Sequence, residues 1–294
     1  MYEKLAVSLS KIPEAAIHIC GYDGPIPAQA PSNIKFHPIF HFKRLSLGRP
    51  KAQRKFYRLL VQLKPELIIV TTHELLLASL FYKQRYGCRL VYDIQENYSL
   101  NLRAQHNYPW IAKQLLALAV RSTERLTAPA IDHFLLAEKS YAEELLFLGD
   151  RYTLVENKYK ELPGQPAPAI PVAIPTAGPL YLLFSGTIAE EYGIREAVHL
   201  SVEMHKLNAS VRLTIIGYCA NAHTLATLKE LIKGKDFIEL IGGDSLVPHA
   251  RILEKIRLSH IGLLPYQPNE STFRCIPTKL YEYMAHGLPV LIQQ

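Results

Sequence analysis

Short apolar segments alternate along the whole chain with longer segments whose apolar residues recur at helical spacing. The short segments are six or seven residues long, rich in Val, Ile, Leu and Tyr, and apolar almost throughout. They occupy residues 17–22, 66–72, 89–94, 133–138, 152–157, 180–186, 211–217, 237–242, 260–266 and 288–293. Continuous apolar runs of this length are typical of strands whose two faces are both covered. We therefore predict strands in parallel sheets at these positions.

The longer segments predict the helices that cover those sheets. Residues 51–64 and 110–126 form such patterns in the first half, and residues 194–207 and 222–234 do so in the second. The alternation of strand and helix predicts an α/β fold, with a parallel sheet wrapped by helices in each half. Because ligands bind beyond the carboxyl ends of the strands in such sheets, we expect the functional residues to follow the strands.

A proline-rich segment separates the two halves. Residues 161–179 contain six prolines, which fix φ and remove backbone donors, so this composition favours an extended connector. The sequence thus predicts a Rossmann-like N-terminal domain over residues 1–160 and a Rossmann-like C-terminal domain over residues 180–294.

The most informative segment is IPTKLYEYMAHGLPVLI, residues 276–292. It predicts a helix that begins near Thr278 and ends at Gly287, with Lys279 and Glu282 on one face. The start of such a helix offers backbone N–H groups and a positive dipole end to a diphosphate, Lys279 adds a charge, and Glu282 can accept hydrogen bonds from ribose hydroxyls. The alternative is an ordinary surface ion pair on an amphipathic helix.

The run from Lys279 to Leu291, KLYEYMAHGLPVL, resembles the signature of the retaining glycosyltransferases of family 4. The resemblance implies the GT-B architecture, in which two Rossmann-like domains face each other across a cleft. The first domain would lie on the acceptor side, and the second would bind the donor. The resemblance also implies that Glu282 binds the ribose of a nucleotide-diphosphate sugar, and that the reaction needs no cofactor and no metal.

A second segment, residues 181–201, is similar to the strand, glycine turn and helix that open the donor domain in that family. Gly186 permits close approach of the backbone to a ligand, and Gly217 after a later strand could face the base or ribose. The family usually has an arginine and a lysine for the diphosphate where this chain has Thr187 and Tyr192. Arg274, which stands where the family has a second glutamate, could supply the missing positive charge.

The first half carries two candidate positions for the acceptor and the sugar. Residues 89–101 resemble the family's Asp-x-His-Asp/Glu segment, with Glu96 in register and Gln95 in place of the histidine. Gln95 can position a sugar by hydrogen bonds but cannot transfer a proton. His73 follows the strand at 66–72, and similar segments in the family face the acceptor. The alternative for His73 is a solvated position at the start of a helix.

Positive charge is concentrated in the first half. The net charge is +7, and from Lys43 to Arg58 there are seven Lys or Arg residues and no acid. The same stretch contains Phe56, Tyr57, Leu59 and Leu60. We expect these residues to give it an apolar side, so that it could dock on an anionic membrane face. The alternative is a solvated basic helix. No nucleic-acid-binding motif accompanies the cluster, so we expect no nucleic acid partner.

The remaining composition is that of a packed protein without export or anchoring signals. No apolar run approaches the roughly 18 residues that span a bilayer, and the first residues do not resemble a signal peptide. We therefore expect a cytoplasmic protein, with peripheral contact at the inner face of the membrane as an option. The four cysteines lack metal-ligand spacing and are expected to be free thiols.

The resemblance implies transfer of a sugar from a nucleotide-diphosphate donor to a glycan or lipid-linked acceptor, with retention of configuration, as in polysaccharide biosynthesis. Family members normally have one more strand at the start and further helices at the end, so a fold incomplete at both ends is also implied. The chain would then be a fragment or a reduced version. Two alternatives stay open: a non-catalytic, degenerate transferase that acts as a scaffold, and a nucleotide-sugar 2-epimerase.

Overall fold

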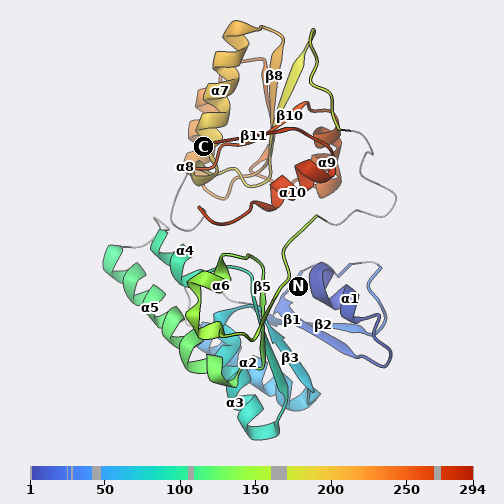
Figure 1. Ribbon diagram of the computed structural model, residues 1–294, viewed down its shortest axis with the longest axis vertical. Helices are drawn as coiled ribbons and strands as arrows, with labels where there is room; N and C mark the ends of the chain where they lie inside the picture. The colour runs from blue at the N-terminus through green and yellow to red at the C-terminus, as the bar shows by residue number, and fades with distance from the viewer. Residues whose placement is uncertain are drawn as a thin grey trace. The chain divides into compact units, whose positions relative to one another are not determined.

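The chain forms two compact units, Met1–Asn157 and Lys158–Gln294, each built around its own parallel sheets. Figure 1 shows the helices and strands of both units in a computed structural model. The structure describes residues 2–24, 26–27, 29–41, 48–104, 109–159, 171–267 and 273–293. Of the predicted connector, residues 161–170 lie outside the described residues.

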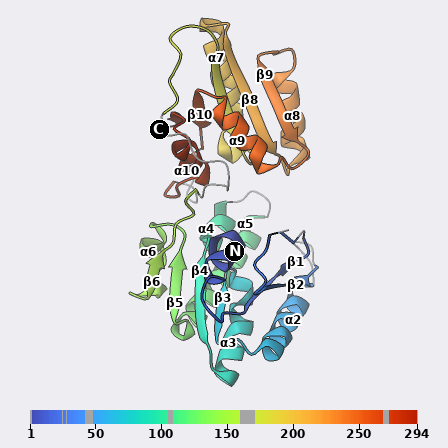
Figure 2. The ribbon, with the colours of Figure 1, turned by 90° about the vertical axis from the view of Figure 1, so that its right-hand side faces the viewer.

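The main sheet of the N-terminal unit is parallel, with the strand order β3-β4-β5-β6. Its strands are β3 (Leu67–Val70), β4 (Arg89–Ile94), β5 (His133–Leu136) and β6 (Tyr152–Leu154). The helices are α2 (Gly48–Leu63), α3 (Leu76–Tyr86), α4 (Tyr98–Ala104), α5 (Trp110–Thr127) and α6 (Tyr141–Glu144). Because the strands follow one another in a single direction, right-handed crossovers bring their connecting helices to one face of the sheet. On this face α2 packs on α3, and α3 packs on α5 (Figure 2).

A separate two-stranded parallel sheet precedes the main sheet. It pairs β1 (Ile17–Tyr22) with β2 (Ile34–Phe40). Strand β2 was not predicted, because Lys35, His37 and Pro38 interrupt its apolar pattern and proline is unusual within sheets. The first helical segment consists of a π-helical turn (Tyr2–Ala6) and α1 (Val7–Leu9).

The C-terminal unit has a five-stranded parallel sheet with the order β11-β10-β7-β8-β9. Its strands are β7 (Leu180–Ser185), β8 (Val211–Tyr218), β9 (Ile238–Gly243), β10 (Ile261–Leu264) and β11 (Val290–Ile292). Its helices are α7 (Ile194–Leu207), α8 (Ala222–Ile232), α9 (His249–Arg257) and α10 (Thr278–Ala285). Alternate residues of β7 enter two cores: Leu182 and Phe184 join the core under α7 and α8, while Leu183 joins the core under α9 and α10.

The predicted fold class is confirmed: both halves are α/β with parallel sheets, and each predicted strand is present with small shifts at its ends. The strands of the C-terminal sheet are mostly apolar because helices cover both faces of this sheet. The four cysteines are free, with Cys219 buried and the other three half-buried. Among the helices that the structure describes, none combines the length and the apolar character needed to cross a bilayer.

Candidate functional site

Two strands of the C-terminal sheet end in glycine turns that pack directly on each other. Gly186, after β7, has φ +88°, and its N–H donates to the carbonyl oxygen of Ile216 at 2.8 Å. A Cβ added at Gly217 would lie 1.6 Å from the Gly186 carbonyl oxygen, so only glycine fits there. A Cβ added at Gly186 would lie 2.8 Å from Cε of Lys279. The turn after β7 is therefore in contact with the first turn of α10.

A buried tyrosine fixes α10 against this turn. Tyr283 is fully buried, and its hydroxyl lies 2.8 Å from Oγ of Ser185 and accepts from the Ser185 N–H at 3.1 Å. Gly262 on β10 leaves room for the ring, since a Cβ there would lie 2.5 Å from Cδ2 of Tyr283. The last residue of β7 and α10 are thus held together by hydrogen bonds, which sets where Lys279 and Glu282 lie. Sequence reasoning did not identify Tyr283 or Ser185 as part of the site.

The ammonium group of Lys279 is buried inside a cage of aromatic rings. Nζ lies 4.8 Å from the centroid of Phe184, 5.3 Å from that of Tyr192 and 5.5 Å from that of Tyr266. Among the described residues, no hydrogen-bond acceptor reaches this nitrogen. Burial lowers the pKa of Lys279 to about 8, and Glu282 opposes this shift. The cage therefore holds a cation to which no described residue supplies a hydrogen-bonded counter-ion.

Glu282 lies one turn beyond Lys279 and already has a partner. Oε1 of Glu282 pairs with Nε2 of His249, the first residue of α9, and the Glu282 side chain is only 15% exposed. Helices α9 and α10 thus meet at this carboxylate. A ribose hydroxyl would have to share Glu282 with His249 or displace it.

The other predicted donor-site residues lie in the segments that adjoin this centre. Thr278 is the first residue of α10 and is exposed, after Pro277 as N-cap. Arg274 lies in the turn before α10, also exposed, and Thr187 is exposed beside Gly186. Tyr192, which stands where the family has a lysine, directs its ring at Lys279. The structure therefore brings together Gly186, Gly217, Lys279 and Glu282, with Thr187, Thr278 and Arg274 at the periphery.

In the N-terminal unit, Gln95 follows β4 and is held by two side chains. Its Oε1 accepts from Nδ2 of Asn157 at 3.2 Å and from Nζ of Lys4 at 3.5 Å. Lys4 also lies 3.6 Å from the buried carboxylate of Asp93, whose pKa burial raises and Lys4 lowers. Glu96 is exposed and accepts from Nδ2 of Asn101 at 2.9 Å.

His73 follows the neighbouring strand β3 and begins the 3₁₀ helix η2 (His73–Leu75). Its ring packs edge-on against Tyr98, with centroids 5.0 Å apart. Burial, with a smaller contribution from Arg49, lowers the pKa of His73 to about 4, so its imidazole is neutral at physiological pH. The solvated histidine considered as an alternative does not fit this position.

A buried polar network supports the loop that carries Gln95 and Glu96. Tyr92 donates to Glu124 at 3.0 Å, and Arg121 pairs with Glu124 at 2.9 Å. Arg121 also donates to Oδ1 of Asn97 at 2.7 Å. Glu124 gave no signal in the sequence, because an acid three residues from Arg121 on an amphipathic helix reads as an ordinary surface pair and its other partner, Tyr92, is distant along the chain. In the part of the chain that the structure describes, no cluster of His, Cys, Asp and Glu is arranged to hold a metal ion.

Comparison with known proteins identifies the fold. No family model matches the sequence, and no curated protein matches it in sequence. Among solved structures, HepE from Anabaena in complex with UDP-glucose matches with a TM-score of 0.55 and 10% identity, over 88% of this chain and 66% of that chain. Sucrose-phosphate synthase from Thermosynechococcus elongatus matches with a TM-score of 0.66 and 14% identity, over 99% of this chain and 73% of that chain. The fold is that of the GT-B glycosyltransferases.

The GT-B fold implied by the resemblance in the sequence is thereby confirmed. Starch synthase IV from Arabidopsis thaliana, bound to ADP and acarbose, also matches, with a TM-score of 0.56 and 10% identity over 83% of this chain and 60% of that chain. The chain spans about two thirds of the length of HepE and somewhat less of the starch synthase. At these identities the likeness establishes the GT-B fold. It does not identify the donor, the acceptor or the activity of this chain.

Proposed function

We propose that the C-terminal unit binds a nucleotide-diphosphate sugar at the junction of the Gly186 turn and the start of α10. The observation that carries this proposal is the buried Lys279 ammonium, which has no hydrogen-bond acceptor among the described residues. A buried cation without such a partner is costly, and a phosphate oxygen would supply the missing acceptor. The first N–H groups of α10 add further donors for the same anion.

Lys279 can compensate for the two cations that this chain lacks. Thr187 and Tyr192 stand at the positions where family members carry an arginine and a lysine for the diphosphate. The ring of Tyr192 faces Nζ of Lys279, so the positive charge lies beside the position of the missing lysine. The nearby Arg274 and Thr278 are the further donors that we assign to the phosphates, and we assign Gly217, which packs on the Gly186 turn, to the nucleoside side of the site.

Glu282 is the residue that we assign to the ribose hydroxyls. Its carboxylate is mostly buried and is oriented by His249, which restricts its rotamers before the ligand arrives. Glu282, Lys279, Arg274 and Thr278 are assigned to the ribose and the phosphates. The nucleobase of the donor must therefore be selected by other residues.

In the reaction that we propose, the sugar passes to a glycan or lipid-linked acceptor with retention of configuration. Lys279 and the α10 N-terminus stabilise the departing diphosphate, which takes the acceptor proton. Gln95 and Glu96 position the sugar by hydrogen bonds, and neutral His73 accepts a hydrogen bond from the acceptor hydroxyl. Since Gln95 does not titrate and His73 has a pKa of about 4, neither acts as a proton shuttle at neutral pH.

A non-catalytic scaffold is the second candidate. It is favoured by the contacts that already engage the polar groups: Gln95 is held by Asn157 and Lys4, and Glu282 by His249. An epimerase would require acid and base groups that these residues do not provide.

The test is to incubate the protein with UDP-, GDP-, ADP- and dTDP-sugars and to follow release of the nucleotide diphosphate and the anomeric configuration of the product. We expect release from one class of donor and a retained configuration. An inverted product, or a C2-epimerised donor, would contradict the proposal. Nucleotide binding without any release over a wide acceptor panel would favour the scaffold.

A further inference from the structure

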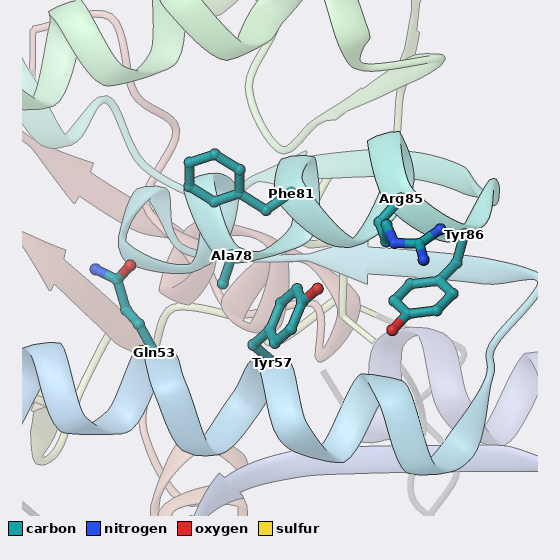
Figure 3. A pocket seen from close by; sticks show the side chains of 6 residues that line it. All are labelled: Gln53, Tyr57, Ala78, Phe81, Arg85 and Tyr86. Atoms are coloured by element: carbon teal, nitrogen blue, oxygen red, sulfur yellow. The ribbon is translucent and has the colours of Figure 1, made fainter.

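The outer face of the helical layer in the N-terminal unit has an unusual composition. Helices α2, α3 and α5 lie side by side on one face of the main sheet, as Figure 3 shows from outside. The three helices carry five, two and three Lys or Arg residues, and their single acid is Glu124. Glu124 is 2% exposed and is bonded to Tyr92 and Arg121. The exposed side of the three helices therefore carries mainly positive charge, although Arg49 and Lys83 pair with Glu74 and Asp132 of the adjacent segments.

Helix α5 adds an apolar stripe to this face. Ile111, Leu115, Leu118 and Leu126 lie opposite its buried residues and are between 57% and 76% exposed. Trp110, in the first turn, is 70% exposed. Apolar side chains of this size in one stripe mark a surface that contacts something other than water.

The middle helix, α3, continues the same mixture of apolar and basic groups. Phe81 is 59% exposed, and Arg85 lies over the ring of Tyr86 at 5.5 Å from its centroid. Between α2 and α3 is a groove of about 510 Å³ into which the Tyr57 ring projects (Figure 3). Its lining residues are Gln53, Tyr57, Ala78, Phe81, Arg85 and Tyr86.

Helix α2 supplies charge but not the apolar side expected from its sequence. Phe56 and Leu60 are buried against the unit, while Lys51, Arg54, Lys55 and Arg58 are exposed. Of the four apolar residues expected to form the docking side of this stretch, Phe56 and Leu60 therefore face the core, and Tyr57 and Leu59 are half-buried. Residues 42–47, which complete the basic stretch from Lys43, lie outside the described residues.

We propose that this face, the outer surface of α2, α3 and α5, docks on an anionic lipid bilayer. The stripe on α5 and Phe81 would enter the headgroup region, where Trp110 is a typical interfacial residue, and the exposed cations would contact anionic headgroups. A second copy of the chain is a poor occupant, because a symmetric pairing would oppose two surfaces of like charge. This inference does not depend on the donor site.

Trp110 makes the proposal directly measurable, because it is the only tryptophan of the sequence. Vesicles made of equal parts phosphatidylcholine and phosphatidylglycerol should shift its emission to the blue, and vesicles of phosphatidylcholine alone should not. Titration with the anionic vesicles gives a partition constant. Arg54→Gln with Arg58→Gln should lower it about 30-fold, at about 1 kcal/mol for each cation near the surface.

Leu115→Gln with Leu118→Gln should lower the same constant about tenfold or more, because two side chains no longer enter the headgroup region. The matched controls are Lys206→Gln with Lys233→Gln and Leu207→Gln with Leu246→Gln. They alter exposed residues of the same types in the C-terminal unit and should leave the partition constant unchanged.

Three results would overturn the proposal: an emission spectrum that anionic vesicles do not move, equal partition of the variants and the wild type, or a blue shift that grows with protein concentration in the absence of lipid. The last would mean that α5 pairs with a second copy. Because no nucleotide is present, failure here leaves the donor-site proposal intact, and failure of nucleotide binding leaves this proposal intact.

Discussion

At the scale of single residues, Lys279 shows how a functional group can oppose stability. The aromatic cage removes its ammonium group from water, no anion among the residues that the structure describes forms a hydrogen bond to it, and burial lowers its pKa from 10.5 to about 8. In the unfolded chain the same group keeps its ordinary pKa. Between pH 8 and 10.5 the unfolded state therefore binds more protons than the folded state, so the stability contributed by this residue rises with pH in that window and is lowest below pH 8.

Lys279→Met should for this reason stabilise the protein at pH 7, by about 2–3 kcal/mol, since it removes a buried charge and keeps the side-chain volume. The free energy of unfolding of the wild type should rise between pH 8 and 10.5 as Lys279 loses its proton, and Lys279→Met should lack this contribution. Urea unfolding followed by circular dichroism at pH 7 and at pH 9.5 measures both effects. Lys233→Met, at an exposed lysine, is the control. A less stable Lys279→Met protein at pH 7 would mean that the ammonium group is paired.

At the scale of elements, the site depends on close contact between strand ends. The Gly186 and Gly217 turns touch through their backbones, and Tyr283 ties α10 to the end of β7. These contacts place the first turn of α10 against the β7 turn. A change in either turn is therefore expected to act on the fold and on the site together.

Gly217→Ala tests this dependence. Its Cβ would meet the Gly186 carbonyl oxygen at 1.6 Å, so the two strand ends must move apart, and we expect a loss of about 3 kcal/mol in the free energy of unfolding. Gly234→Ala is the matched control, because Gly234 has φ +71° but nothing within 4 Å of an added Cβ. Thermal unfolding of both variants compares a steric clash with backbone strain alone. Equal losses in the two variants would show that the contact between the turns contributes little.

At the scale of the whole molecule, the sequence predicted the α/β class and the strands, because continuous apolar runs and amphipathic helices are local patterns. It did not predict β2, whose pattern Lys35, His37 and Pro38 interrupt. In the candidate site, Lys279 and Glu282 were predicted from one helix face. Their partners Phe184, Tyr266 and His249 were not, since the chain brings them together from separate strands and helices.

The fold also determines where the basic and apolar residues of the first half lie on the surface. Seven cations between residues 43 and 58 indicated a basic region, but the sequence placed its apolar side on the same helix. Folding turns Phe56 and Leu60 inward and exposes the apolar stripe of α5 instead. Which face of an amphipathic helix is covered depends on its neighbours, and periodicity alone does not specify it.

The most direct test of the account is calorimetric titration of the protein with UDP, GDP, ADP and dTDP, for the wild type, Lys279→Met and Lys233→Met. We predict that one of these nucleotides binds the wild type and that Lys279→Met weakens binding about 10- to 100-fold, the effect of losing one charge-assisted hydrogen bond to phosphate. Lys233→Met should bind like the wild type. Equal affinity of the Lys279→Met protein, or no binding of any nucleotide to the folded wild type, would contradict the assignment of this site.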